Sequence, residues 1–235
     1  MTSLRILGGG AAQGLVASLA AKFKEQTGLD IEGEFGAVGA MAGKLRGGRP
    51  ADLAVLTAVL IADLARENLV VSDSISDIGR VETAIAVRAG DPLVSVHDAA
   101  SLREVLLVAD AIFVPDTEVS TAGIHVASVL RQLGIADQVA ARLRIYPNGA
   151  TAMRHLAETD AARAVGCTQS TEIIGTKGVK LSGSLPKGCE LATMYTAAAI
   201  TQAAYPEQAR DLISLLSGAD QARLRESAGF LDAKK

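Results

Sequence analysis

Aromatic residues are scarce in this sequence, which has no tryptophan, three tyrosines and four phenylalanines among 235 residues. Few side chains are therefore available for stacking against bases or sugars. The formal net charge is −3, and acidic and basic residues are mixed along the chain without a basic block. The electrostatic footprint of a nucleic-acid-binding protein is missing as well. We therefore expect no nucleic acid among its partners.

Cysteine is also scarce, with only Cys167 and Cys189. Their spacing lacks the short paired pattern of a zinc or redox motif, and two distant cysteines do not establish a disulfide. This favours two buried thiols and leaves their pairing open. The glycine-rich run at 8–14 superficially resembles a dinucleotide-binding motif, but its glycines fall in the wrong register. We expect neither a metal nor a cofactor.

No stretch approaches the roughly 18 apolar residues of a membrane-spanning helix, so we expect no membrane insertion. The N-terminus runs from Met1 into the apolar residues 4–7 without the basic, apolar and cleavage regions of a secretory signal. Two interpretations of the localisation stay open. The protein is periplasmic if this is a mature form with an added Met1, and cytoplasmic if Met1 is the native start.

Hydrophobic residues make up 49% of the chain, and 23 glycines stand against 6 prolines, as in ordered globular proteins. Short apolar runs ended by glycines alternate with segments of helical spacing, which predicts an α/β fold with mainly parallel sheets. We expect strands at 4–7, 30–35, 51–56, 83–88, 111–115, 143–146, 164–168, 179–182 and 192–200. We expect helices at 15–23, 40–46, 58–67, 101–105, 120–133, 150–158 and within 206–226.

Two strand-turn-helix cycles stand in tandem, which predicts two lobes flanking a ligand cleft. One lobe comprises residues 1–82 plus 196–235, and the other comprises residues 83–195. The chain crosses between them near 80–87 and returns near 191–198.

Four glycine-containing turns each end a predicted strand and open a predicted helix. The first turn of a helix has unsatisfied amides and a partial positive charge, so such turns are ready anion sites at the carboxyl ends of strands. The four turns are Gly9-Gly10-Ala11-Ala12, Gly36-Ala37-Val38-Gly39, Ser120-Thr121-Ala122-Gly123 and Asn148-Gly149-Ala150-Thr151.

Five further segments are similar to motifs of one family. They are Phe23-Lys24-Glu25-Gln26-Thr27-Gly28, Arg49-Pro50-Ala51-Asp52-Leu53, Asn68-Leu69-Val70, residues 116–123, and residues 217–222 with Ala228-Gly229-Phe230. Together they resemble the molybdate-binding proteins of ABC transporters, members of the type II periplasmic-binding-protein superfamily. The resemblance implies a two-lobed fold, binding of a small anion in the cleft, and an ABC transporter permease as partner.

The resemblance also identifies ligand positions. Two serines of the family correspond to Ala11 and Val38, its tyrosine corresponds to Gln169, and its backbone donors correspond to Ala122 and Gly149. Because both hydroxyls are missing, we expect weak molybdate binding, and a small carboxylate is an alternative ligand. The candidate ligand-binding residues are Gly10, Ala11, Val38, Gly39, Ser120, Thr121, Ala122, Asn148, Gly149 and Gln169.

Three functions stay open for this cleft. The first is solute binding, in which the lobes close on an anion without reaction. The second is isomerisation of a small tricarboxylate, because the aconitate isomerases are similar to molybdate-binding proteins. Such an enzyme needs a base, for which His125 and Glu172 are the candidates. The third is an anion sensor, although the chain has no predicted helix-turn-helix output module.

Overall fold

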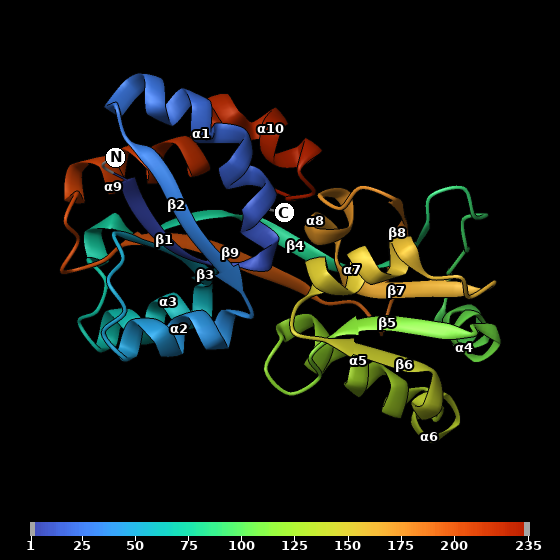
Figure 1. Cartoon of the computed structure of the whole chain (residues 1–235). Coiled ribbons are helices and arrows are strands. Elements are labelled where there is room, and N and C mark those ends of the chain that lie inside the picture. The colour runs from blue at the N-terminus through green and yellow to red at the C-terminus, as the bar shows by residue number, and fades with distance from the viewer. Residues whose placement is uncertain (1–2, 233–235) are drawn as a thin grey trace. The chain divides into compact units, whose positions relative to one another are not determined.

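The computed structural model describes residues 3–232, which form two compact units (Figure 1). Unit 1 comprises the described residues up to Val81 and those from Thr193 onward, and unit 2 comprises Glu82–Ala192. The strands β4 (Ser76–Arg88) and β9 (Ala192–Ala199) carry the chain from one unit to the other. Each unit is built on its own part of the sheet.

Unit 1 has the strand order β2-β1-β3-β9-β4. Strands β1 (Ser3–Gly9), β2 (Asp30–Gly36) and β3 (Leu53–Thr57) run parallel, whereas β9 runs antiparallel to β3. Every residue of β3 is buried. A strand buried on both faces is expected where helices cover both sides of a sheet.

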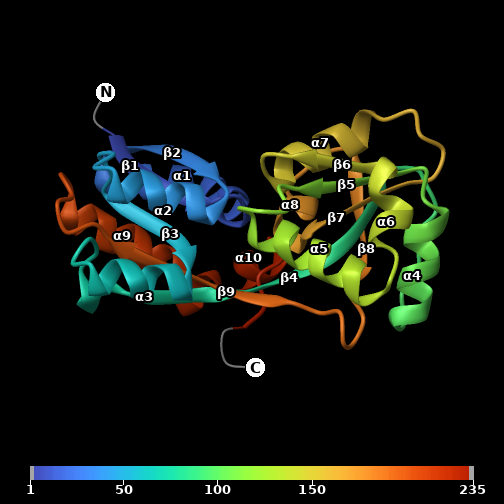
Figure 2. The ribbon, with the colours of Figure 1, turned by 90° about the horizontal axis from the view of Figure 1, so that it is seen from below.

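Helices cover both faces of the unit 1 sheet. Figure 1 shows α1 and α9 on one face and α2 and α3 on the other, and Figure 2 shows α2 and α3 from below. The helices are α1 (Gln13–Thr27), α2 (Val38–Arg46), α3 (Ala58–Arg66), α9 (Pro206–Ser217) and α10 (Ala222–Ser227), with short 3-10 turns at Gly10–Ala12, Ser72–Ser74 and Ala219–Gln221.

Asp52 joins three parts of unit 1. Its carboxylate is fully buried and accepts hydrogen bonds from the backbone N–H of Arg5 (2.8 Å) and of Ala204 (2.7 Å). Buried carboxylates are stable when they are hydrogen-bonded in this way. The side chain therefore ties β1 and the start of β3 to the loop before α9.

Unit 2 is built around β5 (Ala111–Pro115), which lies between β6 (Leu143–Tyr146) and β7 (Ala164–Gln169) and runs parallel to both. The second half of β4 pairs antiparallel with β7 and with β8 (Val179–Ser184). The helices are α4 (Ala99–Val108), α5 (Thr121–Gln132), α6 (Ala136–Val139), α7 (Gly149–Glu158) and α8 (Ser170–Ile174), with a 3-10 turn at Ala140–Arg142.

Alternation along the strands divides the unit 2 core in two. Ile85 and Val87 of β4 belong to the cluster that packs with α4 and α5, whereas Ala84 and Ala86 belong to the cluster that packs with α7. Successive side chains of a strand point to opposite faces, so β4 presents large residues to one face and alanines to the other. The small residues let α7 lie close to the sheet.

The predicted strands and helices are present in the structure. Strand β4, however, begins at Ser76, seven residues before the predicted start at 83, and the short helices α6 and α8 were not predicted. Cys167 and Cys189 are both buried and free, as the composition favoured. None of the helices within residues 3–232 is long and apolar enough to cross a membrane.

Candidate functional site

Two of the four predicted anion-binding turns lie side by side in unit 1. Strands β1 and β2 are parallel neighbours, and Gly9 is in register with Gly36, so the turns that follow them share one edge of the sheet. At this edge the backbone of β1 lies close to side chains of α2 and β9. A Cβ atom on Gly9 would lie 2.6 Å from Cγ1 of Val38 and 2.8 Å from the ring of Tyr195. Glycine is therefore required at position 9.

The unit 1 turns offer backbone amides and no hydroxyl groups at the two family positions. Ala11 and Val38 are 2% and 6% exposed, and both pack into the core. No side chain in the described part of the chain caps the turn at Gly10–Ala12, or α1, or α2. Gly39 lies in the first turn of α2, where amides have no partner within the helix.

The other two turns lie side by side in unit 2. Strands β5 and β6 are parallel, with Pro115 in register with Tyr146, and α5 and α7 begin shortly after them. Both helices therefore point their N-termini toward the same edge of the sheet. The candidates Ser120, Thr121, Ala122, Asn148 and Gly149 lie at these two N-termini.

The N-terminus of α5 is shaped by the loop before it. The Asp116 carboxylate accepts hydrogen bonds from the N–H groups of Glu118 (2.8 Å) and Val119 (3.0 Å). A Cβ on Gly123 would lie 2.0 Å from the carbonyl oxygen of Asp116, so only glycine fits at position 123. Ser120 is the N-cap of α5, and its side chain makes no capping hydrogen bond. The first amides of α5 are thus not capped by a side chain.

The N-terminus of α7 is capped by the chain itself. Asn148 Oδ1 accepts a hydrogen bond from the N–H of Thr151 (2.8 Å). The carboxyl group of Glu172 lies against this turn, where the backbone N–H groups of Gly149 and Ala150 act to lower its pKa. A Cβ on Gly149 would lie 1.9 Å from Oε2 of Glu172. The group that lies against this turn is therefore a carboxyl group of the same chain.

Glu172 ends a run of five consecutive buried polar residues, Thr168–Glu172. The hydroxyl of Thr168 donates to Oε2 of Glu172 at 2.6 Å. Burial raises the pKa of Glu172 above its ordinary value, and the hydrogen bonds from Thr168, from the Gly149 and Ala150 amides, and from the Gln169 backbone oppose this rise. In the same run, Gln169 is 4% exposed, and the Thr171 hydroxyl has no hydrogen-bond partner among the described residues.

His125, the other predicted base, is bonded to a backbone carbonyl. Its Nε2 lies 2.8 Å from the carbonyl oxygen of Cys189, and Gln132, two turns further along α5, donates to the carbonyl of Gly188 at 2.9 Å. A carbonyl oxygen only accepts hydrogen bonds, so Nε2 carries the proton. Only Nδ1 is left as a base on this ring.

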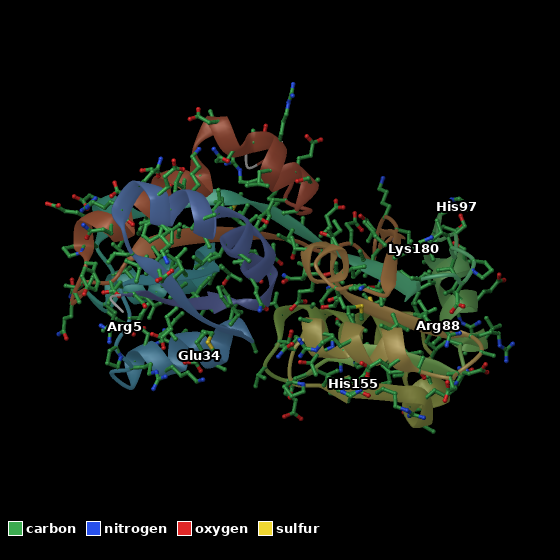
Figure 3. The ribbon with its side chains drawn as sticks, turned by 45° about the horizontal axis from the view of Figure 1, so that its top comes forward. Arg5, Glu34, Arg88, His97, His155 and Lys180 are labelled. Atoms are coloured by element: carbon green, nitrogen blue, oxygen red, sulfur yellow. The ribbon has the colours of Figure 1, made fainter. Side chains whose placement is uncertain are left out.

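The remaining histidines lie elsewhere in unit 2, and Figure 3 shows them apart from each other. His97 contacts the hydroxyl of Ser95 at 2.8 Å. His155 stacks on Tyr146, with 4.3 Å between the ring centroids. No group of three or more His, Cys, Asp or Glu side chains within residues 3–232 could hold a metal ion.

A separate depression of about 550 Å³ lies over β1 and β2 of unit 1. Figure 3 shows two of its residues, Arg5 and Glu34. Its basic residues are paired, because Arg49 contacts Glu34 and Arg5 lies 3.6 Å from Asp52. The depression therefore offers no unbalanced charge to an anion. Its lining residues are Arg5, Ile6, Leu7, Glu32, Gly33, Glu34, Arg49 and Pro50.

The structure thus brings the candidates together in two groups, one in each unit. Gly10, Ala11, Val38 and Gly39 share an edge of unit 1, and the candidates from 120 to 169 share an edge of unit 2. That the two groups line one cleft stays a prediction. The sequence did not indicate the contact of Glu172 with α7, because the two lie on different elements and no local pattern links them.

Comparisons with known proteins identify relatives over almost the whole chain. The sequence model described as bacterial extracellular solute-binding protein matches residues 4–231. An aconitate isomerase from Pseudomonas sp is 24% identical over 239 residues, covering 98% of this chain and 88% of that protein. The likeness thus spans both units.

Solved structures show the same fold. The periplasmic molybdate-binding protein of Azotobacter vinelandii has a TM-score of 0.81 at 18% identity, covering 97% of this chain and 99% of that one. The sulfate-binding protein of Mycobacterium tuberculosis H37Rv has a TM-score of 0.75 at 19% identity, covering 100% of this chain and 88% of that one. The predicted periplasmic-binding-protein fold and the predicted resemblance to molybdate-binding proteins are confirmed.

Proposed function

We propose that this chain, which belongs to the bacterial extracellular solute-binding protein family, binds a small anion through helix N-termini of both units. The observation that carries the proposal is the pair of N-termini, of α2 in unit 1 and of α5 in unit 2, that no side chain of the described residues caps. Helix N-termini attract anions through free N–H groups and the helix dipole. The molybdate-binding and sulfate-binding neighbours support an anionic solute.

The two units would close around the anion, so that the turns at Gly10–Ala11 and Val38–Gly39 face those at Thr121–Ala122 and Asn148–Gly149. Closure of two domains around a ligand is a common binding mode in this fold. The family assignment further supports an ABC transporter permease as the partner that receives the solute. No chemical reaction is required of the binding protein.

The solute is a small carboxylate or an oxyanion. A desolvated tetrahedral oxyanion needs most of its acceptors satisfied, and each lost partner costs about 1–3 kcal/mol in a buried site. Ala11 and Val38 supply no hydroxyl group. We therefore expect carboxylates to bind better than molybdate.

A thermal-shift screen of sulfate, molybdate, and mono-, di- and tricarboxylates tests the proposal, because a ligand selective for the folded state raises the melting temperature. We expect at least one small anion to stabilise the protein saturably, with calorimetry giving one site per chain. A protein stabilised by no anion at matched ionic strength would overturn the proposal.

The second candidate function is isomerisation of a tricarboxylate such as aconitate. The similarity to an aconitate isomerase over 98% of the chain favours it. A proton-shifting reaction needs a base in reach of the substrate and donors for the developing charge. Glu172 or Nδ1 of His125 would be the base, and the N-terminus of α5 would supply donors.

Incubation with cis- and trans-aconitate in deuterated water, followed by proton NMR, separates the two functions. An isomerase interconverts the substrates or exchanges their methylene protons, and His125→Ala or Glu172→Gln then lowers turnover by roughly 10²–10⁴ if that residue is the base. A binding protein shows neither interconversion nor exchange. That outcome would remove the isomerase hypothesis, and a fully active variant would remove its residue as the base.

A further inference from the structure

Tyr195 of unit 1 lies against the backbone of the turn that follows β1. A Cβ atom on Gly9 would lie 2.8 Å from Cε1 of the Tyr195 ring and 3.4 Å from its hydroxyl oxygen. Tyr195 is in register with Thr57, the last residue of β3, and Gly9 is the last residue of β1. The ring therefore lies at the carboxyl edge of the parallel strands, where ligands bind in open α/β sheets.

The tyrosine reaches this turn from a strand that is not a neighbour of β1. Strand β3 lies between β1 and β9 in the sheet. Because adjacent strands are spaced by about 4.8 Å, β9 lies roughly 10 Å from β1. A tyrosine side chain spans most of that distance, whereas a leucine side chain is too short. The contact with Gly9 thus needs an aromatic residue at position 195.

The ring of Tyr195 is held by Phe230. The two rings form an edge-to-face pair, with 6.3 Å between their centroids and 88° between their planes. Both residues are buried, and Phe230 packs against β4, where a Cβ on Gly79 would lie 3.3 Å from the Cβ of Phe230. Edge-to-face pairs are favourable and directional. The Tyr195 ring therefore has little freedom to turn.

Val38 closes the other side of Gly9. Its Cγ1 would lie 2.6 Å from a Cβ there, so the backbone of Gly9 is held between a side chain of α2 and a side chain of β9. No side chain of residues 3–232 caps the turn at Gly10–Ala12 that follows. Tyr195 is 2% exposed, and the family ligand positions Ala11 and Val38 are 2% and 6% exposed. Tyr195 thus belongs to the same buried layer as those two positions.

We propose that Tyr195 is a positioning residue of the solute site: its ring, fixed by Phe230, holds Gly9 so that the amides of Gly10–Ala12 are in place to bind the anion. This inference rests on the proposed function and names the residue of unit 1 that orients these amides. Amides that are already in place lose less entropy when the anion binds, and such preorganisation raises affinity. The role requires no contact between Tyr195 and the solute.

Two substitutions at position 195 separate the ring from the hydroxyl group. Full-length Tyr195→Leu loses the contact with Gly9, and we expect its affinity for sulfate and succinate, measured by calorimetry well below its melting temperature, to fall by about tenfold. Tyr195→Phe keeps the ring and should stay within about threefold of the wild type. A leucine variant that binds like the wild type overturns the proposal. A phenylalanine variant as weak as the leucine variant does so too, because the hydroxyl group would then be the part that matters.

Tyr205→Leu is the matched control, since Tyr205 is a partly buried aromatic residue of unit 1 at the N-cap of α9. It should lower the melting temperature and leave the affinity for both anions unchanged. An equal loss of affinity in Tyr205→Leu and Tyr195→Leu overturns the proposal, because a general loosening of unit 1 would then explain both.

Phe230→Leu is a milder test, and it serves alone if Tyr195→Leu does not fold. It keeps the tyrosine and removes the ring that fixes it, so affinity should fall by about threefold. In the double variant we expect no loss beyond that of Tyr195→Leu, because Phe230 acts through Tyr195. An unchanged affinity in Phe230→Leu, or losses that add in the double variant, overturns the role of the fixed ring.

Amide hydrogen exchange tests the positioning without any solute. In chloride buffer, the peptide covering residues 8–14 should exchange faster in Tyr195→Leu than in Tyr195→Phe or the wild type, while the peptide covering residues 121–132 of unit 2 should exchange alike in all three. Equal exchange of residues 8–14 overturns the positioning role. A wild type that binds no anion but shows this difference would defeat the proposed function alone.

Discussion

The two units carry strand-to-helix turns of the same kind but with different chemistry. In unit 1 the turns present buried apolar residues, Ala11 and Val38, and no side chain of the described residues caps α1 or α2. In unit 2 the corresponding edge holds five consecutive buried polar residues and a helix that Asn148 caps and whose first residue, Gly149, packs against Glu172. Under the proposed function, we therefore expect unit 1 to contribute backbone amides and unit 2 to contribute the side chains that select the solute.

The largest effect on the free energy of unfolding is expected when a glycine of α7 is replaced, and a glycine of α2 serves for comparison. Gly149→Ala would drive a methyl group into Glu172 and Thr168, so we expect it to lower the free energy of unfolding by about 2–3 kcal/mol, as overpacking does. Gly43→Ala is the control, because its Cβ would meet no atom within 4 Å. Since alanine favours the helix, that variant should be stabilised by about 0.5–1 kcal/mol. Urea denaturation measures both, and equal effects would show that the α7 turn is not tightly packed.

The missing hydroxyls of unit 1 give the second prediction. Ala11→Ser with Val38→Ser should strengthen molybdate binding by roughly 1–3 kcal/mol together, because it restores two donors beside amides that no side chain caps. Titration calorimetry of wild type and double variant measures the difference. Submicromolar molybdate binding by the wild type would contradict the view that unit 1 lacks essential donors.

The capping of unit 2 gives a third, smaller contrast. Asn148→Ala removes the bond to the Thr151 amide and should cost about 1 kcal/mol of unfolding free energy, the usual value for an N-cap. Ser120→Ala removes no capping bond and should change stability by less than about 0.5 kcal/mol. Thermal unfolding of the two variants measures both changes in stability. A costly Ser120→Ala would reveal a role of that hydroxyl beyond capping.

The smallest expected effect is on the pH dependence of stability. Burial raises the pKa of Glu172, so the folded protein holds this proton more tightly than the unfolded chain. The stabilising contribution is complete below the ordinary pKa of 4.5 and is lost as pH rises through the folded pKa. We therefore expect the stability of the wild type relative to Glu172→Gln to fall as pH rises.

Glu67 in unit 1 is the control of opposite sign. The hydrogen bond from Arg46 lowers the pKa of Glu67, so its contribution is present above the ordinary pKa and is lost as pH falls through the folded value. Stability of the wild type relative to Glu67→Gln should thus fall as pH decreases. Urea denaturation at several pH values tests both variants. If stability changed with pH in the same direction for both, the assignment of a raised pKa to Glu172 and a lowered pKa to Glu67 would be wrong.

The elements of both units follow from periodicity in the sequence, but contacts between distant segments do not. The first half of β4 contains Gly79, a residue that sequence patterns read as a break. The glycine is required there because a Cβ would lie 2.6 Å from the carbonyl oxygen of Leu231, far along the chain. No local pattern carries that information.

The same reason limits what the sequence says of the candidate site. The turns at the strand ends follow from glycine content and helix starts, and so do their amides. The sequence offered Glu172 as a candidate base, whereas in the structure it is buried and lies against Gly149 of α7. Only the spatial neighbourhood of Gly149 reveals that contact.

The contact of Asp52 with the Ala204 amide spans 152 positions of the chain, and it bears on how the protein is made. Unit 2 is a continuous segment, whereas unit 1 needs β9 and α9 to complete its sheet and to cover α1. Because domains fold as their residues emerge during synthesis, unit 2 can finish first. The first 81 residues must wait for the C-terminal segment, and until it arrives the buried carboxylate of Asp52 has only part of its partners.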